Sequence, residues 1–255
     1  MLARARWGVR AWLLAAGTSM LAAGLGACTG DEGETCEVAT EDISVVALVV
    51  DSGWDIRAAI DFEAGDRRGR NAPLRLCDTD ALVINDRIPD VIVKSDRVEY
   101  AISLPPDGAR SFTFELDREA EGDRVVFEVE LPPAFEITAP MDGDAIDYGQ
   151  EQVLQWEPAL EGGTMHVGLG EVIGGGECLA AHSEGHTYEA AGGVQVDDTG
   201  QWTIPAGAVS SMSPESCTLT YTLSRVLLAP YPDAFEASGR IESRTVRYVD
   251  VMTMQ

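Results

Sequence analysis

Two histidines four residues apart, His182 and His186, are the residues of this chain best suited to bind a metal ion. Imidazoles at this spacing share one face only if the segment is helical. Gly185 lies between them, and Gly192-Gly193 follow nearby, which disfavours a helix. No glutamate follows His182 in the position that a zinc-protease helix requires. We therefore interpret this segment as a polar loop and expect no metal there.

Three acids, Asp142, Asp144 and Asp147, lie within six residues and could offer oxygen ligands to calcium. The twelve-residue acidic loop of an EF-hand, which ends in glutamate, is missing. The pair Asp142-Gly143 is typical of a turn between strands, and we interpret residues 78–80 in the same way. We expect no metal and no cofactor.

No recognisable arrangement for nucleophilic catalysis occurs in the sequence. Gly-x-Ser-x-Gly, Ser-x-x-Lys and a free cysteine beside a histidine are all missing. The glycine run 174–176 lacks the Lys-Ser/Thr of a phosphate loop. Paired carboxylates for glycoside cleavage depend on tertiary geometry, which a sequence does not display. A carbohydrate hydrolase therefore stays as the alternative function.

The only basic cluster in this acidic chain is Arg67, Arg68 and Arg70, interleaved with Gly65 before it and Gly69 within it. The flanking glycines favour a solvated hairpin tip. The alternative is a contact with an anionic glycan or an acidic partner. The net charge of −25 argues against nucleic acid as a partner, because that binding needs clustered lysine and arginine.

The N-terminal segment has the pattern of an export signal. Arg4, Arg6 and Arg10 precede an uncharged apolar run, residues 12–25, that is too short for a stable membrane span. Leu25-Gly26-Ala27-Cys28 follows, and this resembles the lipobox of bacterial lipoproteins. The resemblance implies a signal peptide of residues 1–27 and a diacylated Cys28 that anchors the chain in a membrane.

Lipidation at Cys28 would place the protein in the cell envelope. Thr29 follows the lipidated cysteine, and under the enteric sorting rule it directs the protein to the outer membrane. Loss of the three arginines of the signal peptide would bring the net charge from −25 to −28. We interpret this surplus of dispersed acids as a solvated surface.

Four further cysteines, Cys36, Cys77, Cys178 and Cys217, form an even set in a chain predicted to be exported. Disulfides persist in that compartment, and four cysteines allow three pairings. We favour Cys36–Cys77 with Cys178–Cys217, because each pair then lies within one half of the chain.

Alternating apolar residues predict strands over residues 56–62, 97–104, 112–117 and 125–131. The continuous apolar run 43–50 predicts a strand buried on both faces, with a core helical turn as the alternative. Turn signals between these segments favour an antiparallel sandwich. In the second half we expect strands around Val153–Trp156, Met165–Leu169, Val194–Val196, Trp202–Ile204, Leu219–Leu223 and Val246–Val251, and one helical turn within residues 206–212.

Leu131-Pro132-Pro133 marks the predicted boundary between two domains, since prolines interrupt a ladder. From Phe135 to Trp156 the sequence resembles the opening of extracellular Ig-like modules, and it is similar to a repeat of Ser/Thr-rich cell-wall anchored proteins. The resemblance implies an Ig-like or fibronectin-like sandwich with Trp156 as a core anchor.

Together these patterns predict an all-β protein of two tandem Ig-like sandwiches. The predicted segments are a signal peptide (1–27), the lipidated Cys28 and tether (28–42), the first sandwich (43–132) and the second (133–255). We expect a non-enzymatic binding or structural role toward an envelope protein or glycan. Within residues 229–235, Tyr231 and Phe235 are candidate surface contacts, with a core position favoured for Phe235.

Overall fold

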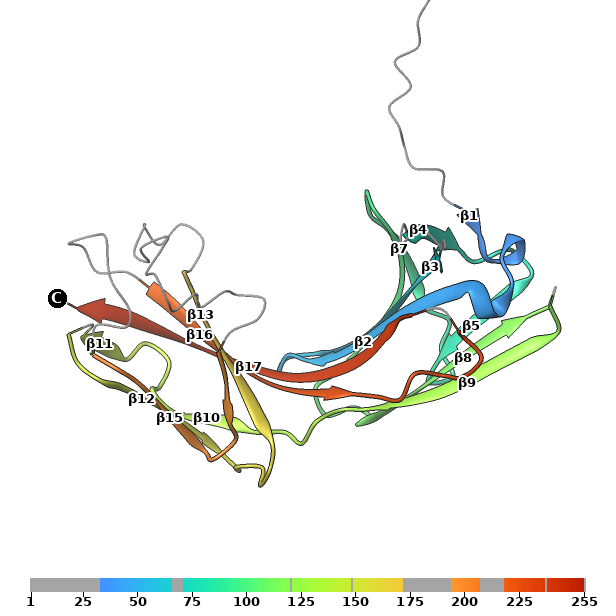
Figure 1. Cartoon of the computed structure of the whole chain (residues 1–255). Coiled ribbons are helices and arrows are strands. Elements are labelled where there is room, and N and C mark those ends of the chain that lie inside the picture. The colour runs from blue at the N-terminus through green and yellow to red at the C-terminus, as the bar shows by residue number, and fades with distance from the viewer. Residues whose placement is uncertain are drawn as a thin grey trace, which may run out of the picture.

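The computed structural model describes residues 33–65, 71–119, 121–147, 149–171, 194–206, 218–236 and 238–254, and their regular structure is β-strand apart from two short turns of 3-10 helix (Figure 1). The prediction of an all-β fold is confirmed. Two 3-10 turns, η1 (Thr35–Glu37) and η2 (Thr40–Asp42), precede the first long strand. The strands are β1 (Gly33–Glu34), β2 (Ile43–Asp51), β3 (Ile56–Gly65), β4 (Asn71–Arg75), β5 (Asp80–Ile84), β6 (Asp90–Val93), β7 (Val98–Leu104), β8 (Ser111–Arg118), β9 (Asp123–Glu130), β10 (Glu136–Ala139), β11 (Ala145–Asp147), β12 (Gln152–Glu157), β13 (Thr164–Glu171), β14 (Val194–Asp197), β15 (Gln201–Ile204), β16 (Thr218–Leu228) and β17 (Arg240–Met254).

One eleven-stranded sheet runs the length of the described molecule, with the order β1-β4-β3-β2-β17-β16-β13-β14 along its main path. Strand β7 pairs with β3 and β6, and β11 pairs with β17. Strand β17 joins the two ends: its first part pairs in parallel with β2, and β16 runs antiparallel along most of its length. Figure 1 shows β17 crossing between the two ends of the molecule.

Two three-stranded sheets, β5-β8-β9 and β10-β12-β15, cover this long sheet at its two ends. The first encloses a core that includes Phe112 and Phe114, and the second encloses Leu154 and Trp156. Along β17, Ile241 packs in the first core and Val249 and Val251 pack in the second. These residues are all odd-numbered, so they point to one face of β17. Both small sheets therefore lie on the same side of the long sheet, and the opposite face, which we call the open face, is concave and carries no second sheet among the described residues (Figure 1).

We call the part built on the first core the first lobe and the part built on the second core the second lobe. The C-terminal segment belongs to both. Phe235 and Ile241 are buried in the first core, although the sequence analysis assigned all of residues 133–255 to the second sandwich. The physical reason is the parallel pairing of β17 with β2, which joins segments about 200 residues apart.

Each alternating segment of the sequence forms a strand, and Trp156 is a core residue at 1% exposure. The run 43–50 is strand β2, but it is not buried on both faces as expected. Its odd-numbered residues are buried, whereas Val46, Leu48 and Val50 are only half-buried, because they lie on the open face of the long sheet. Within the described ranges, no helix is long and apolar enough to cross a membrane.

Candidate binding surface

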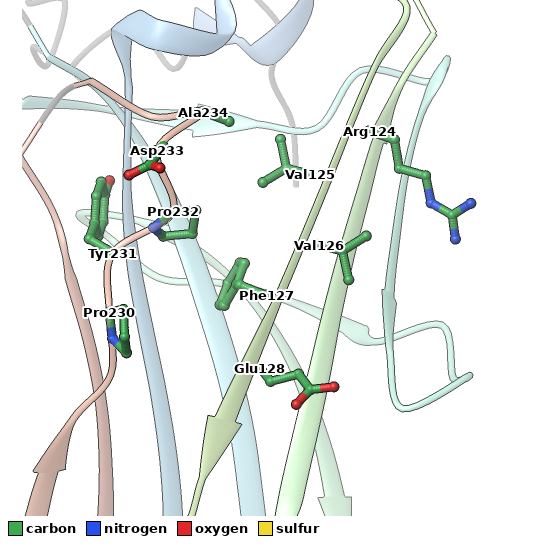
Figure 2. A pocket seen from close by; sticks show the side chains of 10 residues that line it. All are labelled: Arg124, Val125, Val126, Phe127, Glu128, Pro230, Tyr231, Pro232, Asp233 and Ala234. Atoms are coloured by element: carbon green, nitrogen blue, oxygen red, sulfur yellow. The ribbon is translucent and has the colours of Figure 1, made fainter.

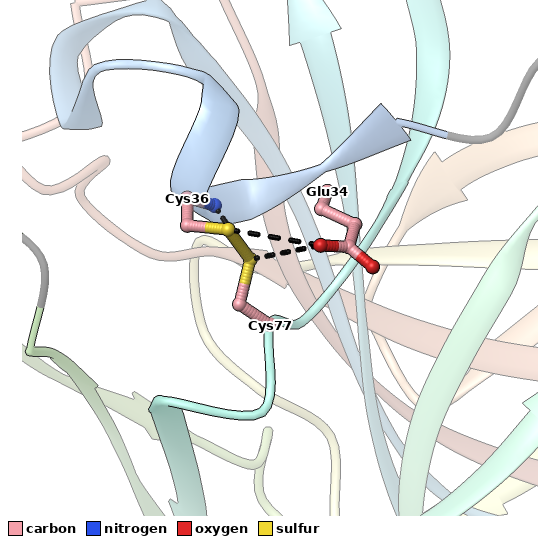
Figure 3. Close-up of side chains that lie close together, drawn as sticks. All are labelled: Glu34, Cys36 and Cys77. Carbon is pink, nitrogen blue, oxygen red and sulfur yellow. Dashed lines mark hydrogen bonds between the residues drawn. A yellow bond between two sulfur atoms is a disulfide. The ribbon is translucent and has the colours of Figure 1, made fainter.

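The predicted pairing of Cys36 with Cys77 is confirmed as a disulfide with a Cα–Cα distance of 5.9 Å. It fastens turn η1 to the segment after β4 (Figure 3). The Glu34 carboxylate lies 3.8 Å from Cys36 Sγ and 3.6 Å from Cys77 Sγ. Among the residues that the structure describes, these three are the only group with metal-type ligand atoms close together. The sulfurs of Cys36 and Cys77 are bonded to each other, so this group offers no thiolate for a metal.

Several residues singled out in the sequence lie outside the described ranges. They are Cys28, the second cysteine pair Cys178 and Cys217, the histidines His182 and His186, and the arginines Arg67, Arg68 and Arg70.

The three acids Asp142, Asp144 and Asp147 do not converge on one point. Asp142 Oδ1 accepts a hydrogen bond from the Asp250 N–H at 3.2 Å. Asp144 Oδ2 accepts one from the Met141 N–H at 2.7 Å, and Asp147 Oδ1 accepts one from the Gly149 N–H at 2.8 Å. Asp144 and Asp147 thus accept from local backbone donors, which fits the interpretation of this segment as turns, whereas Asp142 accepts from strand β17.

The segment 230–234 lies against β9 and lines a shallow pocket of about 500 Å³ (Figure 2). The Tyr231 hydroxyl accepts a hydrogen bond from the Val45 N–H at 2.9 Å, and the ring packs on Phe235 at a centroid distance of 6.2 Å. Phe235 is a core residue, as favoured from the sequence. Both rings therefore anchor the segment, and the groups it presents to solvent are Pro230, Asp233 and Ala234.

A buried carboxylate, Asp51 at the end of β2, holds the two lobes together. Asp51 Oδ2 lies 2.5 Å from Arg110 Nη1, and Oδ1 lies 3.1 Å from Arg247 Nη1. Arg110 also donates to the Pro132 carbonyl, which accepts a second hydrogen bond from Thr245 Oγ1 at 2.9 Å. We call Asp51, Arg110, Pro132, Thr245 and Arg247 the joint, because they link the first lobe, the segment at Pro132 between the lobes, and β17.

The electrostatics of the joint favour the charged form of Asp51. Burial acts to raise the pKa of this carboxyl, but hydrogen bonds from Arg110, Arg247 and the Gly53 N–H outweigh burial, so the pKa lies below its ordinary value. The lobes therefore meet through a stable, ionised contact.

Beside the joint, two aromatic side chains are stacked on the surface. Trp54, in the turn between β2 and β3, lies 5.2 Å from Tyr248 of β17 between ring centroids, with an interplanar angle of 29°. Trp54 is 66% exposed and Tyr248 is 44% exposed. Tyr248 is an even-numbered residue of β17, so it lies on the open face of the long sheet. We call Trp54 and Tyr248 the aromatic pair.

A second notable cluster is acidic and lies on the same open face of the first lobe. Asp61 of β3 stands directly opposite Glu99 of β7. Burial, together with the negative charges of Glu63 and Glu99, raises the pKa of Asp61 from 3.8 to about 6, although Arg97 opposes the rise. Glu99 is ion-paired with Arg57 and, at 2.6 Å, with Lys94.

The sequence analysis did not single out Trp54, Tyr248 or the joint. Trp54 follows the turn signal Asp51-Ser52-Gly53. This signal indicates a turn between two strands but does not indicate which residue packs against Trp54. Tyr248 lies about 190 residues later in the chain, and only the shared sheet brings the two rings together.

The fold and this surface define a two-lobed, all-β protein in which two cores share one long sheet. Comparison with models of known protein families and with curated proteins finds no match for the chain.

Proposed function

We propose that this chain is an exported lipoprotein, anchored in the envelope through Cys28, whose two-lobed body binds an envelope component without catalysis. The lipobox-like Leu25-Gly26-Ala27-Cys28 supports export and anchoring. An acylated cysteine supplies the two chains that stable membrane attachment requires. Thr29 at the next position supports residence in the outer membrane.

The observation that carries the binding role is the aromatic pair on the open face. Contact with water is unfavourable for large apolar side chains. A cluster of exposed ones is therefore a common mark of a binding site. The adjacent joint holds the pair on a preformed surface. Binding to a preformed surface avoids the entropy cost of ordering it.

Replacing Cys28 with alanine tests the anchor. We expect the wild-type chain in the outer-membrane fraction of a density gradient and Cys28→Ala in the soluble fraction, because the variant lacks acyl chains. The matched control is Thr29→Ala, which keeps the cysteine and stays with the membrane. A soluble wild-type chain, or one without acyl mass on its N-terminal peptide, would refute the anchor.

A carbohydrate hydrolase is the second candidate, and the Asp61–Glu99 pair is the observation that favours it. Two neighbouring carboxyls with pKa values pushed in opposite directions are typical of acid–base pairs. Burial acts to raise the pKa of Glu99, but Lys94 and Arg57 outweigh it and lower the pKa. Both oxygens of Glu99 are thereby engaged, which leaves this carboxylate poorly placed to act on a substrate. Glycan turnover that disappears in Asp61→Asn would nevertheless establish the hydrolase.

A further inference from the structure

The aromatic pair has the geometry of a platform for a sugar ring. We propose that Trp54, backed by Tyr248, binds a neutral hexopyranose glycan by stacking the ring face that is turned away from Tyr248 against the C–H face of one sugar unit. This inference depends on the proposed binding role and names its ligand class. A pyranose ring presents an apolar C–H face with hydroxyls at its rim, and aromatic rings with adjoining polar groups complement both parts.

The platform is held in place before any ligand arrives. The Trp54 turn is closed by a hydrogen bond from the Ser52 N–H to the Asp55 carbonyl at 3.0 Å. The Gly53 N–H donates to Asp51 Oδ1 at 2.9 Å, and Gly53 adopts a φ of +93°, which a side chain would strain. Tyr248 is fixed within a fifteen-residue strand. The backbone that carries each ring therefore needs no ordering when a sugar binds.

The exposure of the rings argues against a purely structural role. A tryptophan that served only to clamp the lobes would be expected to bury most of its surface, as Trp156 does at 1% exposure. Trp54 instead leaves 66% of its surface in water while it leans on Tyr248. The clamping of the lobes is already provided by the ion pairs of the joint.

Polar groups suited to sugar hydroxyls flank the rings. Asp55, half-buried in the Trp54 turn, lies close enough to Tyr248 for its charge to contribute to the raised pKa of that phenol, for which burial is the larger cause. Thr222 of β16 stands directly opposite Tyr248 and is half-buried. A carboxylate and a hydroxyl supply an acceptor and a donor at the edges of the platform.

The charge of the chain and the size of the pair select among ligands. A net charge of −25 repels anionic glycans and anionic lipid headgroups, which favours a neutral sugar. A stable protein interface buries about 800 Å² on each partner, far more than two partly exposed rings offer. One or two sugar units match the extent of the pair.

The test uses the full-length chain purified in detergent and three neutral probes: cellohexaose, chitohexaose and maltohexaose. Isothermal titration calorimetry should detect binding of at least one probe. We expect Trp54→Ala and Tyr248→Ala each to weaken that binding about tenfold or more, which matches the loss of one stacking contact. Trp54→Phe should retain part of the affinity. The matched control is Ile88→Ala, which removes an apolar side chain that is 87% exposed elsewhere in the first lobe.

A second measurement does not depend on any variant. The bound glycan should protect Trp54 of the wild-type chain from quenching by acrylamide, whereas Trp156 is buried and Trp202 packs partly buried against the second core, so the glycan should leave their quenching unchanged. Absence of binding by all three probes, full affinity in a folded Trp54→Ala, or unchanged quenching would each overturn the glycan proposal. Membrane fractionation of Cys28→Ala tests the anchor independently, so failure of one proposal is distinguishable from failure of the other.

Discussion

Asp61 illustrates how one side chain can make stability depend on pH. Its pKa in the folded protein is about 6, above the ordinary 3.8, chiefly because burial penalises the charged form. Well below pH 4 the carboxyl is neutral in both states and costs nothing. As the pH rises from about 4 to about 6, the unfolded chain ionises this carboxyl while the folded protein keeps it protonated, so stability falls, and above about pH 6 the loss is complete.

We therefore expect Asp61→Asn to stabilise the protein at pH 7.5 by about 1 kcal/mol, a value reduced from the full shift because the group is partly solvated. The gain should largely vanish at pH 4, as measured by urea unfolding at both pH values. The matched control is Asp90→Asn, which alters an exposed carboxylate on the neighbouring strand β6 and should have little effect at either pH. An equal gain at pH 4 would contradict the explanation.

Buried arginines show what single residues contribute without any signal in the sequence. Arg118 is fully buried and donates to Thr40 Oγ1 and to the Val38 carbonyl, each at 2.7 Å, which ties the N-terminal turns to β8. In the second lobe, Arg225 pairs with Asp198 at 2.6 Å, and Asp198 also accepts from Trp156 Nε1. Arginine is usually a surface residue, so its type alone gives no sign that either side chain is buried.

At the scale of elements, the disulfide acts where the sheet begins. Turns η1 and η2 are only three residues long each, so they make few backbone hydrogen bonds of their own. The disulfide Cys36–Cys77 closes a loop with a sequence separation of 41 that contains β2, β3 and β4. Closing such a loop restricts the unfolded chain, which raises the free energy of unfolding.

Replacing both cysteines, as Cys36→Ser with Cys77→Ser, should lower the free energy of unfolding by about 4 kcal/mol in the chain-entropy account. Urea unfolding under oxidising conditions would measure the difference. In dithiothreitol the wild-type chain and the double variant should unfold at the same urea concentration, which serves as the control. A difference that persists in reductant would show that the serines disturb packing.

At the scale of the whole molecule, the joint makes the two lobes one mechanical unit. Its central carboxylate, Asp51, is 1% exposed and contacts arginines from β17 and from the segment before β8. Its pKa is lowered, so this stabilisation is present above about pH 4 and is lost as the pH falls through the folded pKa.

Asp51→Ala should destabilise the protein by about 3 kcal/mol, because it leaves the mostly buried Arg247 with only the exposed Glu136 carboxylate, 3.8 Å away. The comparison is Glu115→Ala, which breaks the exposed Arg124–Glu115 pair at 2.5 Å and should cost less than about 1 kcal/mol. Urea unfolding followed by tryptophan fluorescence and circular dichroism measures both. Equal losses in the two variants would show that the joint is no more than a surface ion pair.

Local patterns in the sequence determined the strands and the all-β class, and they favoured the Cys36–Cys77 pairing among three possible pairings, while the resemblance to Ig-like modules implied the core position of Trp156. Alternation, turn residues and cysteine parity act over a few neighbours or within one half of the chain, so they are readable without a structure. Only the tertiary structure decided that β17 serves both cores, that Asp51 meets Arg110 and Arg247, and that Trp54 stacks on Tyr248. These contacts join residues about 60 to 200 positions apart, and such pairings depend on how complete sheets pack, which no local pattern encodes.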